Sequence, residues 1–487
     1  MLARNRRKRW TLVGVVGACV TLVTACGSAV PPDQIPELNG AAAANGSGQP
    51  VYVNPSNGNV VAPGSTGGVA NPGVVGPGGS GGGGGTGGGG GGTGGGGGSI
   101  AAGPLAGVHV GSCAGFKNTT GINDSTITLA NVADLSGPVP NLFRSAEAAV
   151  TAYVAYFNST ASICGRKLKV VGLDSGTSES GDQQAAQTAC GQAFAMVGSM
   201  GAFDAGGAST VTRCGIPDIR TTETETARQK SPVVFGAYSL NSAEIPTMPF
   251  DWFKSHFGNA YKNAAFVYLN AGASSLNATA FMAGESRLGY NFKDKIAIDV
   301  TSVPNYNGIV TQLQGDGIKY VQYIGAYQYA QKLKSAMAQQ GYNPTFVMDT
   351  VAYDPNFVAG GSDMSGTYVF ASAPLFQEAN HNPALSTYLT WLQRTSGGQP
   401  NFFGIYAWAA ASLFVQTAAE LGGKLTRSSM IAKLRHVGTD TYDHMTPPQY
   451  VSSKTTPKCY SIIQLQHGQW VRKTPYPYTC GGLVSGS

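Results

Sequence analysis

The chain has 487 residues with 31 Lys and Arg against 25 Asp and Glu, a formal net charge of +6, and only 11% of its residues are charged. This composition excludes a basic nucleic-acid-binding arm and an acidic disordered tail as descriptions of the whole chain. The excess of basic residues is local, because five of them lie within the first nine positions and no acidic residue precedes Asp33. Without those five, the chain has 26 basic and 25 acidic residues. A polyanionic partner, nucleic acid included, therefore has little support.

Residues 1–25 are typical of a signal peptide. A basic start is followed by a mostly apolar run from Trp10 to Ala25, which is shorter than the roughly 20 residues of a membrane-spanning helix. Small residues then precede Cys26, as in a bacterial lipoprotein signal whose cysteine is acylated and becomes the N-terminus. We expect lipidation of Cys26. The alternatives are an ordinary cleaved signal and an uncleaved anchor.

Residues 26–106 are predicted to be a disordered tether. This stretch is rich in Gly, Pro, Asn and Ser, and 20 of the 30 residues from Asn71 to Ile100 are glycine. It has almost no charge and no periodic apolar pattern, so it buries too little surface to offset the entropy lost on ordering. A tether of this length suits a domain carried away from a membrane surface.

Six cysteines remain once Cys19 and Cys26 are assigned to the leader and the lipid. They are Cys113, Cys164, Cys190, Cys214, Cys459 and Cys480. An even set in an exported chain predicts disulfides, and proximity along the chain favours Cys190 with Cys214 and Cys459 with Cys480, leaving Cys113 with Cys164. A metal or redox site is the alternative, but the sequence has no Cys-x-x-Cys and no histidine at ligand spacing from a cysteine.

From residue 124 onward, short β-rich runs alternate with amphipathic helical stretches. Residues 125–132 form the first predicted strand, and apolar residues then recur at helical spacing from Phe143 to Phe157, with Asn141 placed to cap that helix. The pattern continues with strands at 168–173, 195–200 and 216–221 and helices at 182–194 and 206–213. Because parallel strands need crossover helices, we expect a parallel sheet with helices on both faces.

A break at 240–249 precedes a second series of the same kind. Its strands are predicted at 264–268, 294–300, 319–324 and 345–348, and its helices at 277–288, 306–314 and 330–340, the last closed by Gly341. Later elements are a strand at 368–371, helices at 383–394, 405–421 and 427–434, and a hairpin through 460–465 and 469–472.

The predicted fold class is α/β, with two doubly wound parallel-sheet lobes joined by a hinge. The first lobe spans 107–241 with later helices from about 375–440, and the second spans 242–374 with a C-terminal hairpin at about 441–487. We expect a ligand cleft between the lobes, at the carboxyl ends of their strands.

Three stretches carry a resemblance to a known family: LSGP at 135–138 after the first strand, CGRKLKV at 164–170, and YNGIVTQLQGDGIKYVQYIGAY at 306–327. With the order of elements over 127–471, they resemble the type I periplasmic-binding-protein fold, specifically the leucine-isoleucine-valine-binding proteins of branched-chain amino-acid ABC transporters. Cys190 and Cys214 stand at the place of that family's disulfide.

The resemblance implies a set of ligand-binding residues. In such proteins, hydroxyls and helix N-termini of the first lobe hold the ligand carboxylate, while an acid and tyrosines of the second lobe hold its ammonium. The matching positions here are Ser136, Phe203, Asp204, Thr222, Thr224, Tyr327, Asp349 and Thr350. Thr224 is the best match for the family's hydroxyl, Tyr327 falls on its post-strand aromatic, and Asp349 or Thr350 falls on its acidic position.

The sequence departs from the family pattern in two loops. Phe203 and Asp204 replace a serine-rich loop, and a carboxylate aimed at a ligand carboxylate would oppose it; Asp204 could equally cap the short helix that starts at Gly206. Ala273-Ser274-Ser275 replaces a second tyrosine. These departures count against an α-amino acid and open the site to a neutral, amide-like, polyol or cationic molecule. We therefore expect a small polar solute: an amino acid, an amide or a related solute.

The leading hypothesis is a monomeric, lipid-anchored solute-binding protein at the outer face of the cytoplasmic membrane, which closes on its ligand and presents the closed form to an ABC permease. We expect no enzymatic activity and no cofactor. We also expect no metal site, since the six histidines are scattered along the sequence. Two alternatives stay open. One is a ligand-sensing receptor module on the same fold, and the other is a wall-associated α/β hydrolase.

Overall fold

The structure is a computed structural model that describes residues 52–53, 60–61 and 103–487. The chain divides into two units, with the boundary between Gly92 and Thr93. In the first unit, β1 (Tyr52–Val53) pairs antiparallel with β2 (Val60–Val61). The predicted signal peptide, Cys26 and most of the predicted tether lie outside the described residues.

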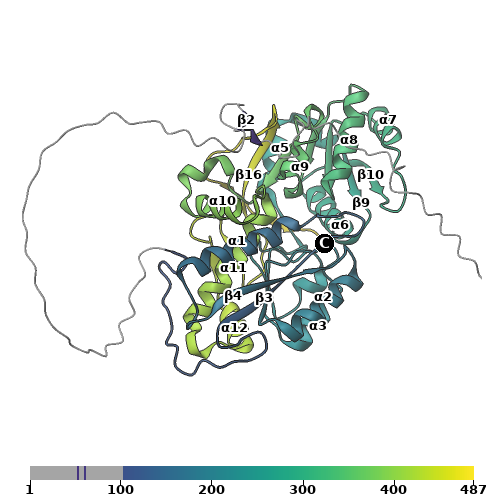
Figure 1. Ribbon diagram of the computed structural model, residues 1–487. Coiled ribbons are helices and arrows are strands. Elements are labelled where there is room, and N and C mark those ends of the chain that lie inside the picture. The colour runs from purple at the N-terminus through teal and green to yellow at the C-terminus, as the bar shows by residue number, and fades with distance from the viewer. Residues whose placement is uncertain (1–51, 54–59, 62–102) are drawn as a thin grey trace, which may run out of the picture. The chain divides into compact units, whose positions relative to one another are not determined.

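The first lobe of the second unit contains a parallel five-stranded sheet, ordered β4-β3-β5-β6-β7 (Figure 1). Its strands are β3 (Thr126–Ala133), β4 (Lys167–Asp174), β5 (Ala195–Val197), β6 (Asp218–Arg220) and β7 (Val234–Gly236). The helices between them are α1 (Arg144–Thr160), α2 (Glu179–Gln192), α3 (Ala208–Cys214) and α4 (Thr226–Gln229). The predicted parallel pairing is thereby confirmed.

Two local predictions in this lobe differ from the structure. The strand predicted to reach residue 200 ends at Val197, because Gly198 has φ +62, a conformation that breaks an extended strand. Asn141 does not cap α1, which begins at Arg144 without a side-chain cap; Asn141 has φ +60, and its Oδ1 accepts a hydrogen bond from Arg144 Nε at 2.7 Å instead.

The second lobe contains a larger mixed sheet, ordered β10-β9-β11-β12-β13-β16-β17. Its strands are β9 (Ala264–Leu269), β10 (Phe292–Ile298), β11 (Tyr320–Ile324), β12 (Thr345–Met348), β13 (Tyr368–Ala371), β16 (Cys459–Gln466) and β17 (Gln469–Arg472). Its helices are α5 (Thr247–His256), α6 (Gly272–Arg287), α7 (Tyr306–Gly315), α8 (Tyr327–Gln339) and α9 (Pro355–Val358). The first five strands are parallel, and the predicted C-terminal hairpin extends the sheet in antiparallel fashion.

The end of the chain returns to the second lobe. Short strands there are β8 (Glu244–Pro246), β18 (Thr479–Cys480) and β19 (Leu483–Ser485), and β14 (Thr439–Asp440) pairs with β15 (Gln449–Tyr450) in one of the connections between the lobes. β19 pairs antiparallel with β8, and β18 pairs with β16. The last residues are therefore fixed to the body of the lobe, an arrangement that the sequence did not indicate.

The chain crosses between the lobes three times: after β7, after β13, and after α12 (Arg427–Leu434). Helices α10 (Pro383–Ser396), α11 (Phe402–Leu421) and α12 return to the first lobe, where α10 and α11 pack on α1 (Figure 1). The crossing segments bond to one another, because the Ser239 N–H donates to Gln449 Oε1 at 3.2 Å and the Tyr442 hydroxyl donates to the Ala237 carbonyl at 2.7 Å. These segments form the joint between the lobes.

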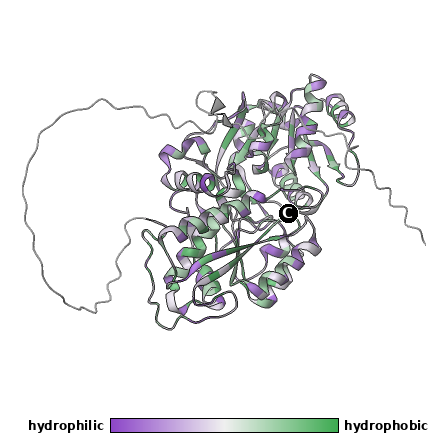
Figure 2. Cartoon of the chain, viewed as in Figure 1, coloured by the Kyte–Doolittle hydropathy of each residue, from purple (hydrophilic) through white to green (hydrophobic). Residues whose placement is uncertain are grey.

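The cores follow from the sequence pattern, with apolar strands inside and helices that expose their polar faces (Figure 2). Helix α11 is an exception, since it is apolar on all sides. Asn401 caps it by accepting a hydrogen bond from the Gly404 N–H at 2.9 Å. Among the described residues it is the helix long and apolar enough to cross a membrane, but the segment is 94% buried within the protein, as expected of a core helix.

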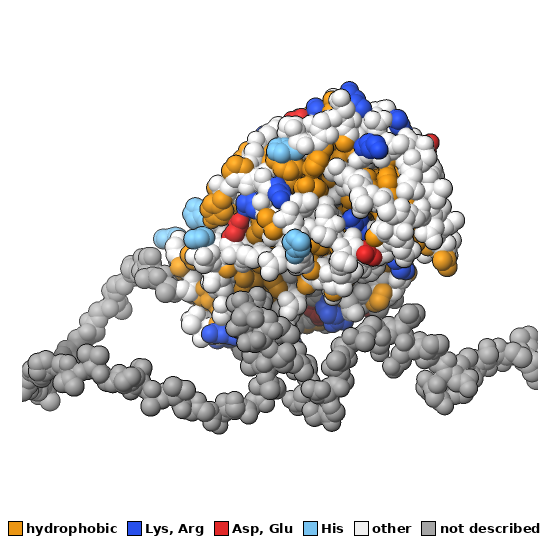
Figure 3. Space-filling model, turned by 90° about the horizontal axis from the view of Figure 1, so that it is seen from above, with side chains coloured by type: hydrophobic (Ala, Val, Ile, Leu, Met, Phe, Trp, Pro, Cys, Tyr) orange, Lys and Arg blue, Asp and Glu red, His pale blue; other side chains and the backbone are white. Residues whose placement is uncertain are grey.

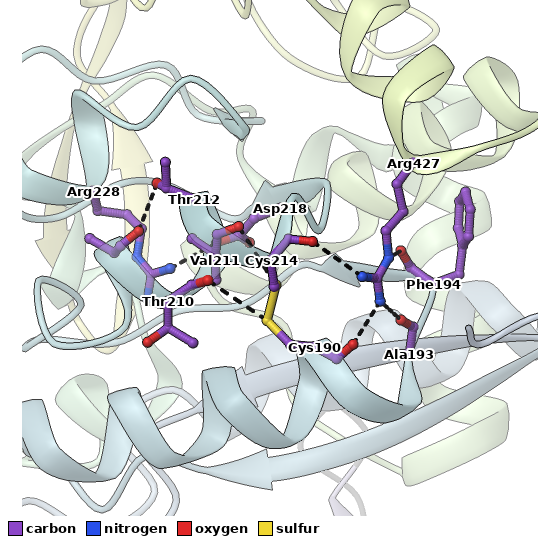
Figure 4. Close-up of a disulfide and its surroundings, with 11 residues drawn as sticks. Cys190, Ala193, Phe194, Thr210, Val211, Thr212, Cys214, Asp218, Arg228 and Arg427 are labelled. Carbon is purple, nitrogen blue, oxygen red and sulfur yellow. Dashed lines mark hydrogen bonds and ion pairs between the residues drawn. A yellow bond between two sulfur atoms is a disulfide. The ribbon is translucent and has the colours of Figure 1, made fainter. Parts of the chain in front are cut away.

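Three disulfides join the cysteines as proximity predicts: Cys113–Cys164, Cys190–Cys214 and Cys459–Cys480. Cys190–Cys214 links α2 to α3, and the guanidinium of Arg427 lies beside it (Figure 4). Arg427 donates hydrogen bonds to the carbonyls of Cys190 at 2.9 Å, Ala193 at 2.6 Å and Phe194 at 3.2 Å. One side chain of α12 thus ties the late helices to the ends of α2 and β5.

Candidate binding site between the lobes

A cavity lies between the lobes, at the carboxyl ends of the strands of both sheets. Its empty volume is about 860 Å³, part of which is open to solvent. The first lobe contributes residues that follow β5, β6 and β7 and the start of α11, and the second contributes the start of α6 and the residues that follow β11 and β12. The cleft expected from the sequence is therefore present.

Most of the cavity wall is apolar, and much of it is aromatic. On the first-lobe side the rings of Phe143 and Phe403 meet edge to face, with centroids 5.0 Å apart. On the second-lobe side the rings of Phe281 and Phe370 lie 5.9 Å apart. Further apolar lining comes from Leu142, Met200, Leu240, Ile324 and Val351. Such a surface favours a ligand with a substantial apolar body.

Few polar side chains line the cavity. They are Thr222, Thr224, Tyr238, Ser274, Asn277, Asp349 and Thr350. The hydroxyl of Thr224 donates to the Gly201 carbonyl at 2.7 Å, so it already has a partner, whereas the Thr222 hydroxyl is buried without one. A buried polar group without a partner costs free energy, so Thr222 is suited to hydrogen-bond a ligand.

Asp349 is the carboxylate in the cavity lining. It follows β12, and its Oδ1 accepts a hydrogen bond from the Val351 N–H at 3.2 Å. Burial raises its pKa from 3.8 to about 7, because desolvation disfavours the charged form and no ion pair within the described residues involves this side chain. A cationic or hydrogen-bond-donating ligand group would supply the missing partner.

Behind the first-lobe wall lies a buried ionic cluster. Arg220 pairs with Asp204 at 3.5 Å and with Asp218 at 3.3 Å. Arg228 pairs with Asp182 at 2.6 Å and also with Asp218, at 3.2 Å. The five side chains are at most 1% exposed. Because a buried charge needs a partner, this cluster keeps the loops after β5 and β6 in one arrangement.

Four of the eight predicted ligand residues line the cavity: Thr222, Thr224, Asp349 and Thr350. The other four lie outside the lining. Ser136 is on an exposed loop, where its N–H donates to Asp174 at 3.2 Å. Phe203 packs where the lobes meet, beside Gly272, and Tyr327 is the half-buried first residue of α8, packed on the core.

The structure places Asp204 outside the cavity lining and away from the start of α3. Its carboxylate accepts hydrogen bonds from the N–H groups of Thr224 at 2.9 Å and Glu225 at 3.0 Å, and it pairs with Arg220. It therefore points into the protein, where it is fully buried. Helix α3 begins at Ala208 without a side-chain cap.

Sequence reasoning missed the aromatic part of the site. Phe281 and Phe370 belong to a predicted helix and a predicted strand, and Phe403 precedes the helix predicted at 405–421. No local signal separates a ring that faces a cleft from one that faces the interior. Tyr238 was missed for a different reason, since it lies in the crossing segment after β7 and not in a loop that matches the family.

The described residues offer no other obvious chemistry. Within residues 103–487 and the two short strands before them, no group of His, Cys, Asp and Glu is arranged to hold a metal ion. On the face shown in Figure 3, basic and acidic side chains are scattered singly and do not form a large patch of one sign. The cavity between the lobes is thus the leading candidate site.

A family model described as periplasmic binding protein matches residues 126–469, which is most of the chain and includes both lobes and the cavity. The chain belongs to the periplasmic binding protein family. This confirms the resemblance inferred from the sequence and agrees with the two α/β lobes. None of the curated proteins matches this periplasmic binding protein in sequence.

Solved structures of several binding proteins share the fold. The substrate-binding protein LivJ of Streptococcus pneumoniae, in complex with isoleucine, has 14% identity and a TM-score of 0.60, over 74% of this chain and 100% of that one. A fatty acid ABC transporter substrate-binding protein from Thermomonospora curvata has 18% identity and a TM-score of 0.60, over 76% and 94% of the two chains. An R. palustris solute-binding protein in complex with 4-hydroxybenzoate has 14% identity and a TM-score of 0.60, over 74% and 97%.

Proposed function

We propose that this periplasmic binding protein is the extracytoplasmic solute-binding component of an ABC-type uptake system. The observation that supports it most is the cavity between two α/β lobes that are joined by three crossing segments. A small solute bound there would contact both lobes, so its binding free energy favours the closed form over the open one. The closed form is what a membrane permease would recognise.

The proposal includes a lipid anchor and a monomeric state. The anchor is supported by the leader sequence that directly precedes Cys26. A glycine-rich segment follows, and it is long enough to separate a domain from a membrane. The protein would then act at the outer face of the cytoplasmic membrane. Solved relatives of similar fold are named for amino acids, fatty acids and benzoates, so the fold itself does not select one solute.

The experiment that tests the proposed function starts from the full chain, purified without denaturant. Bound small molecules are released and identified by mass spectrometry, and the identified solute is then titrated back by calorimetry. We expect one stoichiometric solute and a decrease in the radius of gyration by X-ray scattering when it binds. A failure to find any solute, together with scattering that does not change with any candidate, would contradict the proposal.

A further inference from the structure

Five backbone N–H groups in the loops of the first lobe donate hydrogen bonds to the protein's own carboxylates. After β5, the Ala202 N–H donates to Asp134 at 2.8 Å, the Ala205 N–H to Glu225 at 2.8 Å, and the Gly207 N–H to Asp182 at 2.7 Å. After β6, the N–H groups of Thr224 and Glu225 donate to Asp204. A ligand carboxylate would find these donors occupied.

The same loops offer an incoming anion no cation. The residues that line the cavity include no Lys, Arg or His. The guanidinium groups of Arg220 and Arg228 lie behind the wall, fully buried and paired with Asp182, Asp204 and Asp218. A carboxylate that lost its water in this cavity would have neither a counter-charge nor the donors after β5, and burying an unpaired charge is strongly unfavourable.

Two groups in the lining point to the polar end that the cavity can accept. Asp349, on the second lobe, offers carboxylate oxygens that lack a cationic partner among the described side chains. The Thr222 hydroxyl, on a residue 3% exposed, is buried without a hydrogen-bond partner on the first lobe. An ionised Asp349 can only accept hydrogen bonds, and the Thr222 hydroxyl can accept or donate, so together they suit a ligand donor such as an amine, an amide or a hydroxyl.

We propose that the solute of this binding protein is a mainly apolar molecule that carries no carboxylate and directs a hydrogen-bond donor at Asp349. Its apolar body would lie between the aromatic pair Phe143 and Phe403 of the first lobe and the pair Phe281 and Phe370 of the second. This inference rests on the proposed function and narrows its solute class. It departs from the amino acids that the resemblance implies.

The test uses matched sets of probes that share an apolar body and differ in the polar end. The sets are leucine, leucinamide and 3-methylbutylamine; phenylalanine, phenylalaninamide and 2-phenylethylamine; and benzoate, benzamide and benzylamine. Each probe is titrated into the full chain by calorimetry and thermal shift. Within at least one set, we expect the amide or the amine to bind at least about tenfold more tightly than the acid. An acid that binds as tightly as its amide and amine would overturn the inference and leave the proposed function intact.

A variant links the preference to the site. Asp349→Asn is expected to weaken binding of the preferred amine at least about tenfold, because it removes the carboxylate but keeps the side-chain shape. Asp363→Asn is the matched control: Asp363 is also on the second lobe, where it bonds to Ser335, and does not line the cavity. Equal affinities in both variants and in the parent would contradict the assignment to Asp349.

If no probe binds, the solute released from the purified chain decides. A released molecule without a carboxylate supports the inference, and a released carboxylate overturns it while the function stands. If no probe binds and no molecule is released from the purified chain, the proposed function fails, and the inference fails with it. The two failures are therefore distinguishable.

Discussion

The backbone N–H of Ala273 donates a hydrogen bond of 3.0 Å to the carbonyl oxygen of Ala202. This bond joins the start of α6 in the second lobe to the loop after β5 in the first, at the margin of the cavity. Gly272 makes the approach possible, because it has φ +47 and an ideal Cβ placed on it would lie 2.5 Å from the Ala202 oxygen. The lobes thus meet here without intervening side-chain atoms from residue 272.

The first prediction concerns this contact. Gly272→Ala should keep the lobes apart, so that the identified solute binds at least about tenfold more weakly and no longer reduces the radius of gyration. Gly317→Ala is the matched control, since Gly317 also has positive φ, +66, but has open space around its Cβ position. Both variants should lose about 1 kcal/mol of stability through backbone strain. Equal solute affinity in the two would show that closure does not need this contact.

A second prediction concerns the pH dependence of solute binding. Burial raises the pKa of Asp349 to about 7, and the charge of Asp349 in turn helps to raise the pKa of the phenols of Tyr238 and Tyr323. Below pH 7 its carboxyl is increasingly protonated, so affinity for an amine solute should fall by up to about tenfold per pH unit, while the amine itself stays charged. Calorimetry between pH 5.5 and 8 checks this. In Asp349→Asn the dependence should disappear, and an equally steep profile there would assign it to another group.

A third prediction concerns stability. Glu223 is fully buried beneath the cavity, and desolvation, only partly opposed by the charge of Lys454, raises its pKa from 4.5 to about 7. The folded state therefore binds this proton more tightly than the unfolded state does. Its contribution is present below pH 4.5 and is lost as the pH rises toward 7, by about 3 kcal/mol.

Urea unfolding of the parent and of Glu223→Gln at pH 5 and pH 8 measures this contribution. The parent should lose more of its stability over that interval than the variant does. Glu179→Gln, at an exposed position in the first turn of α2, should retain the parent's profile. If Glu223→Gln also retained it, the carboxyl of Glu223 would not be the group that titrates.

A fourth prediction concerns Arg427, whose guanidinium donates to the carbonyls of Cys190, Ala193 and Phe194. Arg427→Lys keeps the charge but loses the planar array of donors, and we expect a loss of about 2 kcal/mol in the free energy of unfolding. Arg435→Lys is the control, because Arg435 donates to the carbonyl of Pro232 at an exposed position. This variant should lose less than about 0.5 kcal/mol in the free energy of unfolding. Similar unfolding midpoints for the two variants would contradict the role given to Arg427.

A fifth prediction concerns the lipid anchor. The full chain expressed in a bacterium that processes lipoproteins should enter the detergent phase on phase separation, because acyl chains on Cys26 would carry it there. Cys26→Ser should shift it to the aqueous phase, whereas Cys19→Ser should leave partitioning unchanged. Detergent partitioning that survives Cys26→Ser would refute lipidation at that residue.

Much of the fold is determined by local patterns in the sequence. The alternation of β-rich runs, such as 126–133, with amphipathic helices gives a clear signal. Buried parallel strands appear as short apolar runs, whereas apolar residues in the crossover helices recur with the helical period. The three disulfide pairs follow from proximity, and they are confirmed. The return of the chain end to pair with β8 could not be predicted, because strand pairing at long range leaves no local signal.

Only part of the site could be predicted from the sequence. Residues that directly follow strands, such as Thr222 and Asp349, could be placed at the cleft, because parallel strands deliver their carboxyl ends to one edge of the sheet. The direction of the Asp204 carboxylate was decided by tertiary structure, since its partners Thr224 and Arg220 reach it only when the loops after β5 and β6 are side by side. The aromatic lining was also decided by tertiary structure, because hydrophobic periodicity places Phe281 and Phe370 in a helix and a strand but does not show whether their rings face a core or a ligand.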